Sequence, residues 1–89
     1  MNKNRLHENS VIAITQADYV NQYNIKLSFS DGLERVINFE PFLNKAMNPM
    51  TTQFKDLKKF KQFHLDNGDL LWGDYEMCFP IWDLYIGEI

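Results

Sequence analysis

The sequence predicts an α+β domain in which a mainly antiparallel sheet is built from two hairpins, at about residues 23–39 and 61–73, plus an N-terminal strand. Apolar and polar residues alternate strictly over residues 23–29, which is typical of a strand with one buried face. Asn67-Gly68 stands between two apolar runs and is a strong signal for a two-residue hairpin turn. Apolar residues also recur at helical spacing in three short stretches, which predict helices near residues 41–47, 52–60 and 80–86.

The length and composition indicate a single domain over residues 1–89. Its first ten residues are polar and aperiodic, so we expect a loose arm followed by a folded part over about residues 11–86. With 45% hydrophobic and 15% aromatic residues, the chain has enough apolar surface to build one core. The only cysteine, Cys78, excludes an internal disulfide, and between Met77 and Phe79 we expect it to be buried and unreactive.

The charge and the apolar runs exclude several classes of protein. The net charge of −3 opposes long-range attraction to nucleic acid, so we expect no DNA or RNA partner for the whole domain. No run approaches the roughly 20 apolar residues of a membrane span, and the first ten residues lack the apolar segment of a secretion signal. We therefore expect a soluble cytoplasmic protein without a membrane partner.

The first strand is expected over residues 11–17, "VIAITQA", because it is apolar and rich in β-branched residues. The first hairpin follows, and its register depends on the loop length. A two-residue loop would place Phe29 opposite Glu34, whereas a loop of residues 30–32 places it opposite Leu33. The longer loop also puts Gly32 at the last position, where positive φ is required, so we predict this register.

One residue of the first hairpin disagrees with the apolar pattern. The predicted register places Arg35 opposite Leu27. We expect the arginine stem to lie along the sheet and its charged head to reach water.

The three helices are predicted from their ends as well as their spacing. Pro41 fits a first helical position, and Asn48-Pro49 is expected to end that helix. The second helix is expected to be capped by Thr51 or Thr52, with an apolar face formed by Phe54, Leu57 and Phe60. The third is expected to begin at Pro80 and end at Gly87, with Ile81, Leu84 and Tyr85 pointing inward.

The second hairpin brings a cluster of acidic residues together. A two-residue turn at Asn67-Gly68 places Leu65 opposite Leu70 and Phe63 opposite Trp72, all on one face. The other face then carries His64, Asp66, Asp69 and Leu71. We interpret the acidic residues as the outward face of a hairpin.

The alternative is a small metal-dependent protein or enzyme that uses His64, Asp66 and Asp69. The first two share a strand face, and the third lies across the turn. A hairpin tip is a poorly fixed place for ligands, and the spacing does not match a calcium loop. The chain also has no serine elbow, phosphate loop or paired zinc motif, so we expect no cofactor and no enzymatic activity.

Two groups of surface residues are candidates for binding. A basic patch of Lys55, Lys58, Lys59 and Lys61 is expected on the solvated face of the second helix. Its alternatives are docking of an acidic partner and a DNA-associated regulatory role. Exposed Trp and Tyr residues are typical of protein interfaces. Of Trp72, Tyr75, Trp82 and Tyr85, we expect at least two to fill the core. The partner-binding candidates are Trp72, Asp74, Tyr75, Trp82 and Tyr85.

The "SDG" turn, "LERVINFEPFL", and "NGDLLWGDYEMCFPIWDLY" together resemble the bacterial family called domain of unknown function 2442, over about residues 11–86. This chain reads "WGDYEMCFP" where many members have a short Trp-Pro-Asn-Gly-like turn. The resemblance implies no catalytic residues. Some relatives are fused to a helix-turn-helix, and others are similar to partners of a small neighbouring protein in toxin–antitoxin-like pairs. We therefore expect a non-enzymatic interaction module whose partner is a small protein encoded nearby, with a homodimer as the alternative.

Overall fold

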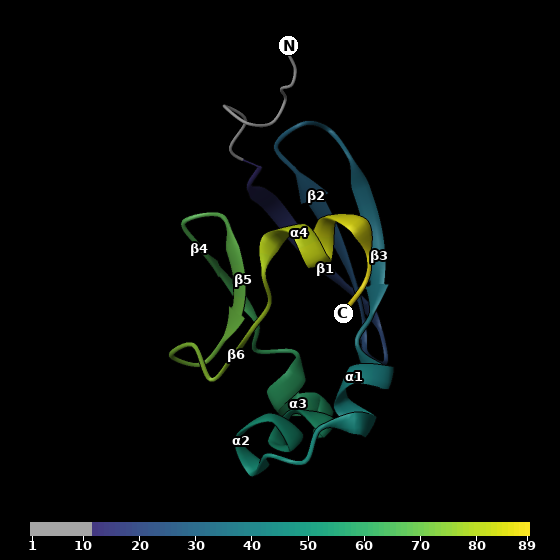
Figure 1. The fold of residues 1–89 in the computed structure, drawn as a ribbon, viewed down its shortest axis with the longest axis vertical. Helices are drawn as coiled ribbons and strands as arrows, with labels where there is room; N and C mark the ends of the chain where they lie inside the picture. The colour runs from purple at the N-terminus through teal and green to yellow at the C-terminus, as the bar shows by residue number, and fades with distance from the viewer. Residues whose placement is uncertain (1–11) are drawn as a thin grey trace.

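A computed structural model describes residues 12–89 and contains two three-stranded antiparallel sheets, and the short helices that connect the two sheets lie at one end (Figure 1). The first sheet has the order β1-β2-β3 and comprises β1 (Ile14–Asn21), β2 (Asn24–Phe29) and β3 (Glu34–Asn38). The second has the order β4-β5-β6 and comprises β4 (His64–Asp66), β5 (Asp69–Trp72) and β6 (Met77–Cys78). The predicted α+β class with antiparallel pairing is confirmed, although the strands are divided between two sheets. The expected arm, residues 1–10, lies outside the described residues.

Strand β1 begins later and runs further than the predicted residues 11–17. Its inward positions are Ile14, Ala17 and Tyr19, and the change from an even to an odd number is accommodated by a register shift between Ile14 and Gln16. The apolar run predicted the first half of β1. The second half, residues 18–21, is mostly polar, and the sequence pattern did not predict it. A tight turn with Gln22 at φ 47° leads into β2.

The predicted register of the first hairpin is confirmed. Ile25 pairs with Ile37, and the Phe29 amide donates a hydrogen bond of 2.8 Å to the Leu33 carbonyl oxygen. Gly32 adopts φ 96°, as the three-residue loop requires. Matching the buried faces of the two strands was sufficient to predict the loop length.

Arg35 pairs with Leu27 as predicted, and its head also makes a hydrogen bond within the protein that the sequence did not predict. Its Nε donates a hydrogen bond of 2.7 Å to the carbonyl oxygen of Tyr85 in α4 (Ile81–Ile86). A carbonyl near a helix C-terminus lacks a helical partner and attracts a cation. Arg35 thus ties the end of the chain to β3, and α4 ends at Gly87 with φ 79°, as predicted.

The predicted second helix is interrupted. The helical end contains α1 (Glu40–Lys45), α2 (Pro49–Thr52), the 3-10 turn η1 (Gln53–Lys55) and α3 (Leu57–Phe60). Asn48 caps α2 by accepting a hydrogen bond from the Met50 amide, so Asn48-Pro49 begins a helix, and the predicted threonine cap is wrong. Asp56, with extended backbone, caps α3 in the same way.

This interruption changes the apolar face of the region. Phe54 and Phe60 are buried as predicted, but Leu57 is 37% exposed. The break at Asp56 rotates Leu57 away from the other two side chains, because residues on either side of a break no longer follow one helical period.

The second hairpin has the predicted register, with Leu65 opposite Leu70 and Asp66 opposite Asp69. Its turn has positive φ at both Asn67 and Gly68. The tip is not free, because the Ile14 amide of β1 donates a hydrogen bond of 2.9 Å to the Gly68 carbonyl oxygen. The expectation of a poorly fixed hairpin tip is therefore wrong.

One core joins the sheets and the helices. Its fully buried members include Ile25, Leu27, Phe39, Leu43, Phe60, Leu70, Trp72 and Leu84. Trp72 has ring neighbours from several elements, namely Phe39, Phe54, Phe60, Phe63 and Phe79. Because these rings come from distant parts of the sequence, the core holds the short elements in place.

Candidate functional site

Tyr75 lies on the outer face of the second sheet. It is 52% exposed, and its hydroxyl donates a hydrogen bond of 3.2 Å to the Asp66 carboxylate. The negative charge of Asp66 and this hydrogen bond raise the pKa of Tyr75 above its usual value. The Tyr75 ring therefore extends from the turn after β5 across this face to Asp66. Leu71 lies on the same face and is only 1% exposed. Leu71 points to the outer face of the hairpin, as predicted. It is nevertheless buried, so the expectation that it is exposed there is wrong.

The backbone of Tyr75 has φ 60°, a left-handed conformation that is uncommon for a residue other than glycine. Holding a bulky residue there costs on the order of 1–3 kcal/mol. The conformation directs a large, partly apolar side chain onto the sheet surface, and such strained residues cluster at binding and active sites.

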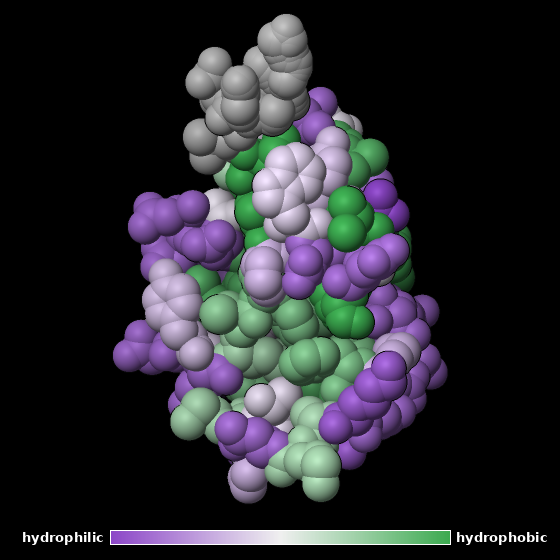
Figure 2. All heavy atoms as spheres, viewed as in Figure 1, coloured by the Kyte–Doolittle hydropathy of each residue, from purple (hydrophilic) through white to green (hydrophobic). Residues whose placement is uncertain are grey.

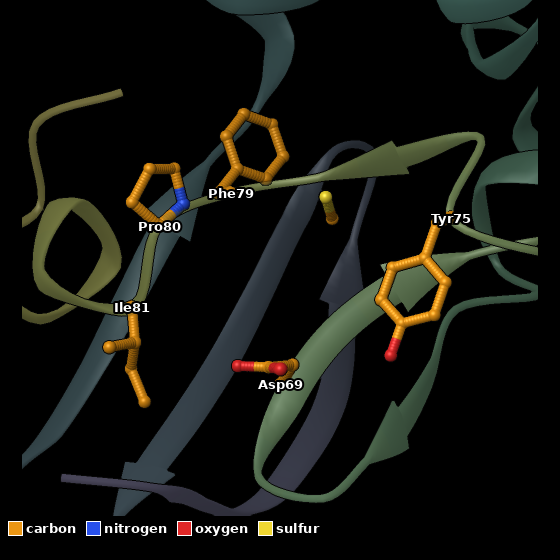
Figure 3. Close-up of a pocket in the computed structure, with 6 residues that line it drawn as sticks. Asp69, Tyr75, Phe79, Pro80 and Ile81 are labelled. Atoms are coloured by element: carbon orange, nitrogen blue, oxygen red, sulfur yellow. The ribbon is translucent and has the colours of Figure 1, made fainter. Parts of the chain in front are cut away.

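A cavity of about 360 Å³ lies beside Tyr75 (Figure 3). It is lined by Asp69, Tyr75, Cys78, Phe79, Pro80 and Ile81. Strands β5 and β6 pair only at Leu71–Cys78 and Trp72–Met77, after which the chain turns at Pro80 into α4. The cavity lies where the chain after β6 turns away from β5. Asp69 is on one side of it, and the segment from Phe79 to Ile81 is on the other.

Cys78 is an exposed free thiol on the wall of this cavity, so its predicted burial is wrong. Met77 is 4% exposed and faces the core. Because successive residues of a strand point to opposite faces, the side chain of Cys78 must point outward. Apolar neighbours in the sequence were therefore misleading for an edge strand of two residues.

The outer face of α4 adds apolar surface near the cavity. Trp82 and Ile86 are one helical turn apart, and they are 48% and 52% exposed. The ring of Trp82 packs edge-on against Tyr85, whose ring packs in turn against Phe29 of β2. In the view of Figure 2, hydrophobic residues occupy the middle of this face, and hydrophilic residues border them. Trp82 is thus held in place from one side while its other side remains open.

The remaining partner-binding candidates divide clearly. Trp72 is fully buried, so its proposed role at an interface is wrong. It faces the same side of the hairpin as Leu70, and that side packs on the core. Asp74 is exposed beside Tyr75, and Tyr85 is half-buried with its hydroxyl donating to the Asp31 carboxylate.

Two of the metal candidates border different cavities. His64 lines a second cavity of about 250 Å³ together with Lys59 and Glu76, whereas Asp69 lines the first. Within residues 12–89, no group of three or more His, Cys, Asp or Glu side chains is arranged to hold a metal ion. Asp66 faces Asp69 across the strands and accepts the hydrogen bond from Tyr75.

The four lysines of the predicted basic patch lie on or directly after adjoining short elements. All four lysines are exposed, as expected, but Lys55 ends η1, Lys58 and Lys59 lie in α3, and Lys61 follows α3. The ammonium group of Lys61 lies 4.9 Å from the centre of the Tyr19 ring in a cation–π arrangement.

Sequence reasoning missed Phe79, Pro80 and Ile81 as site residues. The signal was present in Pro80, which lacks an N–H and cannot continue the ladder between β5 and β6. A proline directly after so short a strand indicates a point where the chain must leave the sheet.

A family model described as "Protein of unknown function (DUF2442)" matches residues 14–88. The chain belongs to this family. The DUF2442 match includes both sheets, the helical end, the cavity and α4. No curated protein and no solved structure matches the chain. Within residues 12–89, no helix of this DUF2442 protein is long and apolar enough to cross a membrane.

Proposed function

We propose that this DUF2442 protein is a non-enzymatic interaction module that docks a small partner protein on its aromatic face, defined here as Tyr75, Phe79, Pro80, Ile81 and Trp82. The observation that carries the proposal is the combination of an exposed, strained Tyr75 with an apolar cavity directly beside it. Large aromatic side chains next to a pocket are typical of the residues that dominate binding energy at protein interfaces.

The shape of the cavity favours one inserted side chain. Its volume of about 360 Å³ is at the small end of the range for ligand pockets. Phe79, Pro80 and Ile81 provide apolar walls on which an aliphatic or aromatic side chain would be desolvated. Trp82 lies directly after Ile81 and extends the apolar surface beyond the cavity. We propose that a partner that fills the cavity also covers Trp82, which is exposed on the helix that follows the cavity wall.

An enzymatic role has less support from the arrangement of the side chains. A cysteine nucleophile needs a base within hydrogen-bond reach, and His64 lies at the other cavity. The cavity wall beside Cys78 offers a tyrosine and an aspartate, whose negative charge disfavours a thiolate. Binding without chemistry is the simpler function for these residues.

The proposal is tested with the product of a neighbouring gene. The two proteins are titrated by calorimetry, and we expect Trp82→Ala to weaken binding about tenfold or more. Val36→Ala is the matched control, because Val36 is 55% exposed on β3, far from the aromatic face in sequence. Unchanged affinity for Trp82→Ala and for Ile81→Ala, or no complex with any neighbour at micromolar concentration, would contradict the proposal.

The family resemblance adds a biological setting, in which the pair is toxin–antitoxin-like. We expect the neighbouring protein to slow growth when it is produced alone, and this chain to relieve that effect. The Trp82→Ala variant should relieve it less than Val36→Ala does. Relief of the same extent by both variants would separate any protective role from the aromatic face.

A further inference from the structure

The charges of the chain are divided unequally along its length. The sequence has nine Lys and Arg and twelve Asp and Glu, and residues 62–89 contain six of the acidic residues and none of the basic ones. This segment thus carries a formal charge of −6, and the preceding 61 residues carry +3. The six acidic residues are Asp66, Asp69, Asp74, Glu76, Asp83 and Glu88. The whole cavity is lined by residues of this segment.

Three of these carboxylates belong to the cavity wall or to neighbours of residues that line it. Asp69 is part of its wall, and Figure 3 shows Asp69 on the side opposite Phe79. Asp66 faces Asp69 across the hairpin and holds the Tyr75 hydroxyl, and Asp74 is exposed next to Tyr75 in the sequence. Within residues 12–89, none of the six acidic residues forms an ion pair with a lysine or arginine. Within that part of the chain, no basic side chain neutralises their charge.

We infer that the partner segment bound by the aromatic face is basic, with one apolar side chain that enters the cavity and flanking Lys or Arg residues that meet Asp66, Asp69 and Asp74. This inference rests on the proposed function and specifies its partner. The apolar walls require a side chain that loses little on desolvation, whereas the acidic rim attracts cations. Arginine fits best, because its planar head pairs with carboxylates and also stacks on exposed aromatic rings such as Tyr75 and Trp82.

Other occupants fit these charges less well. An acidic peptide or a nucleic-acid phosphate would meet like charges at the rim. A second copy of the chain offers Lys58 and Lys59 beside the partly exposed Leu57. That contact would join the helical end of one copy to the aromatic face of the next, and such a head-to-tail arrangement grows into filaments unless it closes. We therefore assign the face to a different, basic protein.

Cys78 provides a direct measurement, because it is the only cysteine of the chain and lies on the cavity wall. The probe is a short capped peptide with a central leucine flanked by arginines. At saturation we expect it to slow alkylation of Cys78 by iodoacetamide about tenfold, since only the free protein reacts. A peptide with glutamates in place of the arginines, and one with glycine in place of the leucine, should leave the rate nearly unchanged. Equal protection by the glutamate peptide would overturn the inference.

The acidic residues are tested by Asp66→Asn combined with Asp69→Asn. We expect this double variant to weaken binding of the arginine peptide about tenfold and to reduce its salt dependence. Asp18→Asn is the control, because Asp18 is an exposed acidic residue of β1 outside the 62–89 segment. The fold of each variant is checked by circular dichroism. An intact double variant that binds the peptide as well as the Asp18 control does would contradict the inference.

The two proposals fail in different ways. In one case, Trp82→Ala weakens binding of the neighbour-encoded partner, but neither salt nor the double Asp variant changes its affinity. The proposed docking face is then supported, and the inference of a basic partner is wrong. If protection of Cys78 rises with protein concentration alone and disappears on changing Lys58 and Lys59 to glutamate, the occupant is a second copy, and the inference is again wrong.

Discussion

The indole N–H of Trp72 donates a hydrogen bond of 2.7 Å to the carbonyl oxygen of Phe60. Both residues are fully buried, and their rings lie 5.6 Å apart. The bond satisfies a carbonyl at the C-terminal end of α3, which has no partner within that four-residue helix. It therefore ties the second sheet to the helical end through the centre of the core.

Trp72→Phe tests this relationship. The variant removes the donor, leaves the Phe60 carbonyl oxygen buried without a partner, and opens a small cavity. We expect the free energy of unfolding in urea to fall by about 2–4 kcal/mol. Trp82→Phe is the control, and its effect should stay within about 0.5 kcal/mol because Trp82 is half-exposed. Equal effects of the two substitutions would contradict the central role of Trp72.

Gly68→Ala and Gly32→Ala separate backbone strain from steric contact. Both glycines have positive φ, so each alanine variant should lose about 1–2 kcal/mol from its left-handed conformation. A Cβ at Gly68 would also lie 2.7 Å from the Cβ of Ala13, whereas none of the described atoms lies within 4 Å at Gly32. We expect Gly68→Ala to cost roughly 1–3 kcal/mol more in urea denaturation. Equal losses would show that Ala13 does not hinder a Cβ at position 68.

The hydrogen bond from the Tyr85 hydroxyl to Asp31 predicts a pH dependence. It lowers the pKa of Asp31 below its ordinary value of 3.8, because the bond favours the ionised carboxylate. A lowered pKa in the folded state contributes stability that is complete above 3.8 and is lost as the pH falls through the folded-state pKa. Near neutral pH, we expect the melting temperature of Tyr85→Phe to lie below that of the unmodified protein. This difference should shrink as the pH falls below 3.8. A gap that stays constant with pH would assign the loss to packing alone.

Metal ions should leave the stability unchanged. Melting temperatures with zinc, manganese or calcium should coincide with that in a chelator, because a ligand that binds only the folded state must raise its stability. The reason for expecting no shift is that, within residues 12–89, no three His, Cys, Asp or Glu side chains are arranged to hold a metal ion. A clear shift that His64→Ala abolishes would restore the metal-dependent alternative.

Duplex DNA should be retained weakly or not at all at moderate salt. The net charge of −3 opposes binding to the phosphate backbone. Electrophoretic mobility shift is the measurement, with Lys55, Lys58 and Lys59 changed to glutamate as the matched variant. Tight binding that survives moderate salt and is lost in this variant would support the DNA-associated alternative.

Features that depend on neighbouring residues were determined by the sequence alone. Both hairpin registers follow from matching apolar positions across short loops, as in Ile25 opposite Ile37 and Leu65 opposite Leu70. The end of α4 at Gly87 follows from its positive φ. The outward direction of Asp66 and Asp69 follows from the alternation of side chains along a strand.

The site was decided by tertiary structure, because burial depends on which distant segment covers each face. Trp72 was a plausible interface residue until five rings from other parts of the chain enclosed it. Cys78 is exposed because Met77 takes the core position of a strand that contributes only two residues. The cavity exists because Pro80 turns the chain away from β5 while Tyr75 reaches back to Asp66. These relationships join segments through space, and periodicity along the chain carries no information about them.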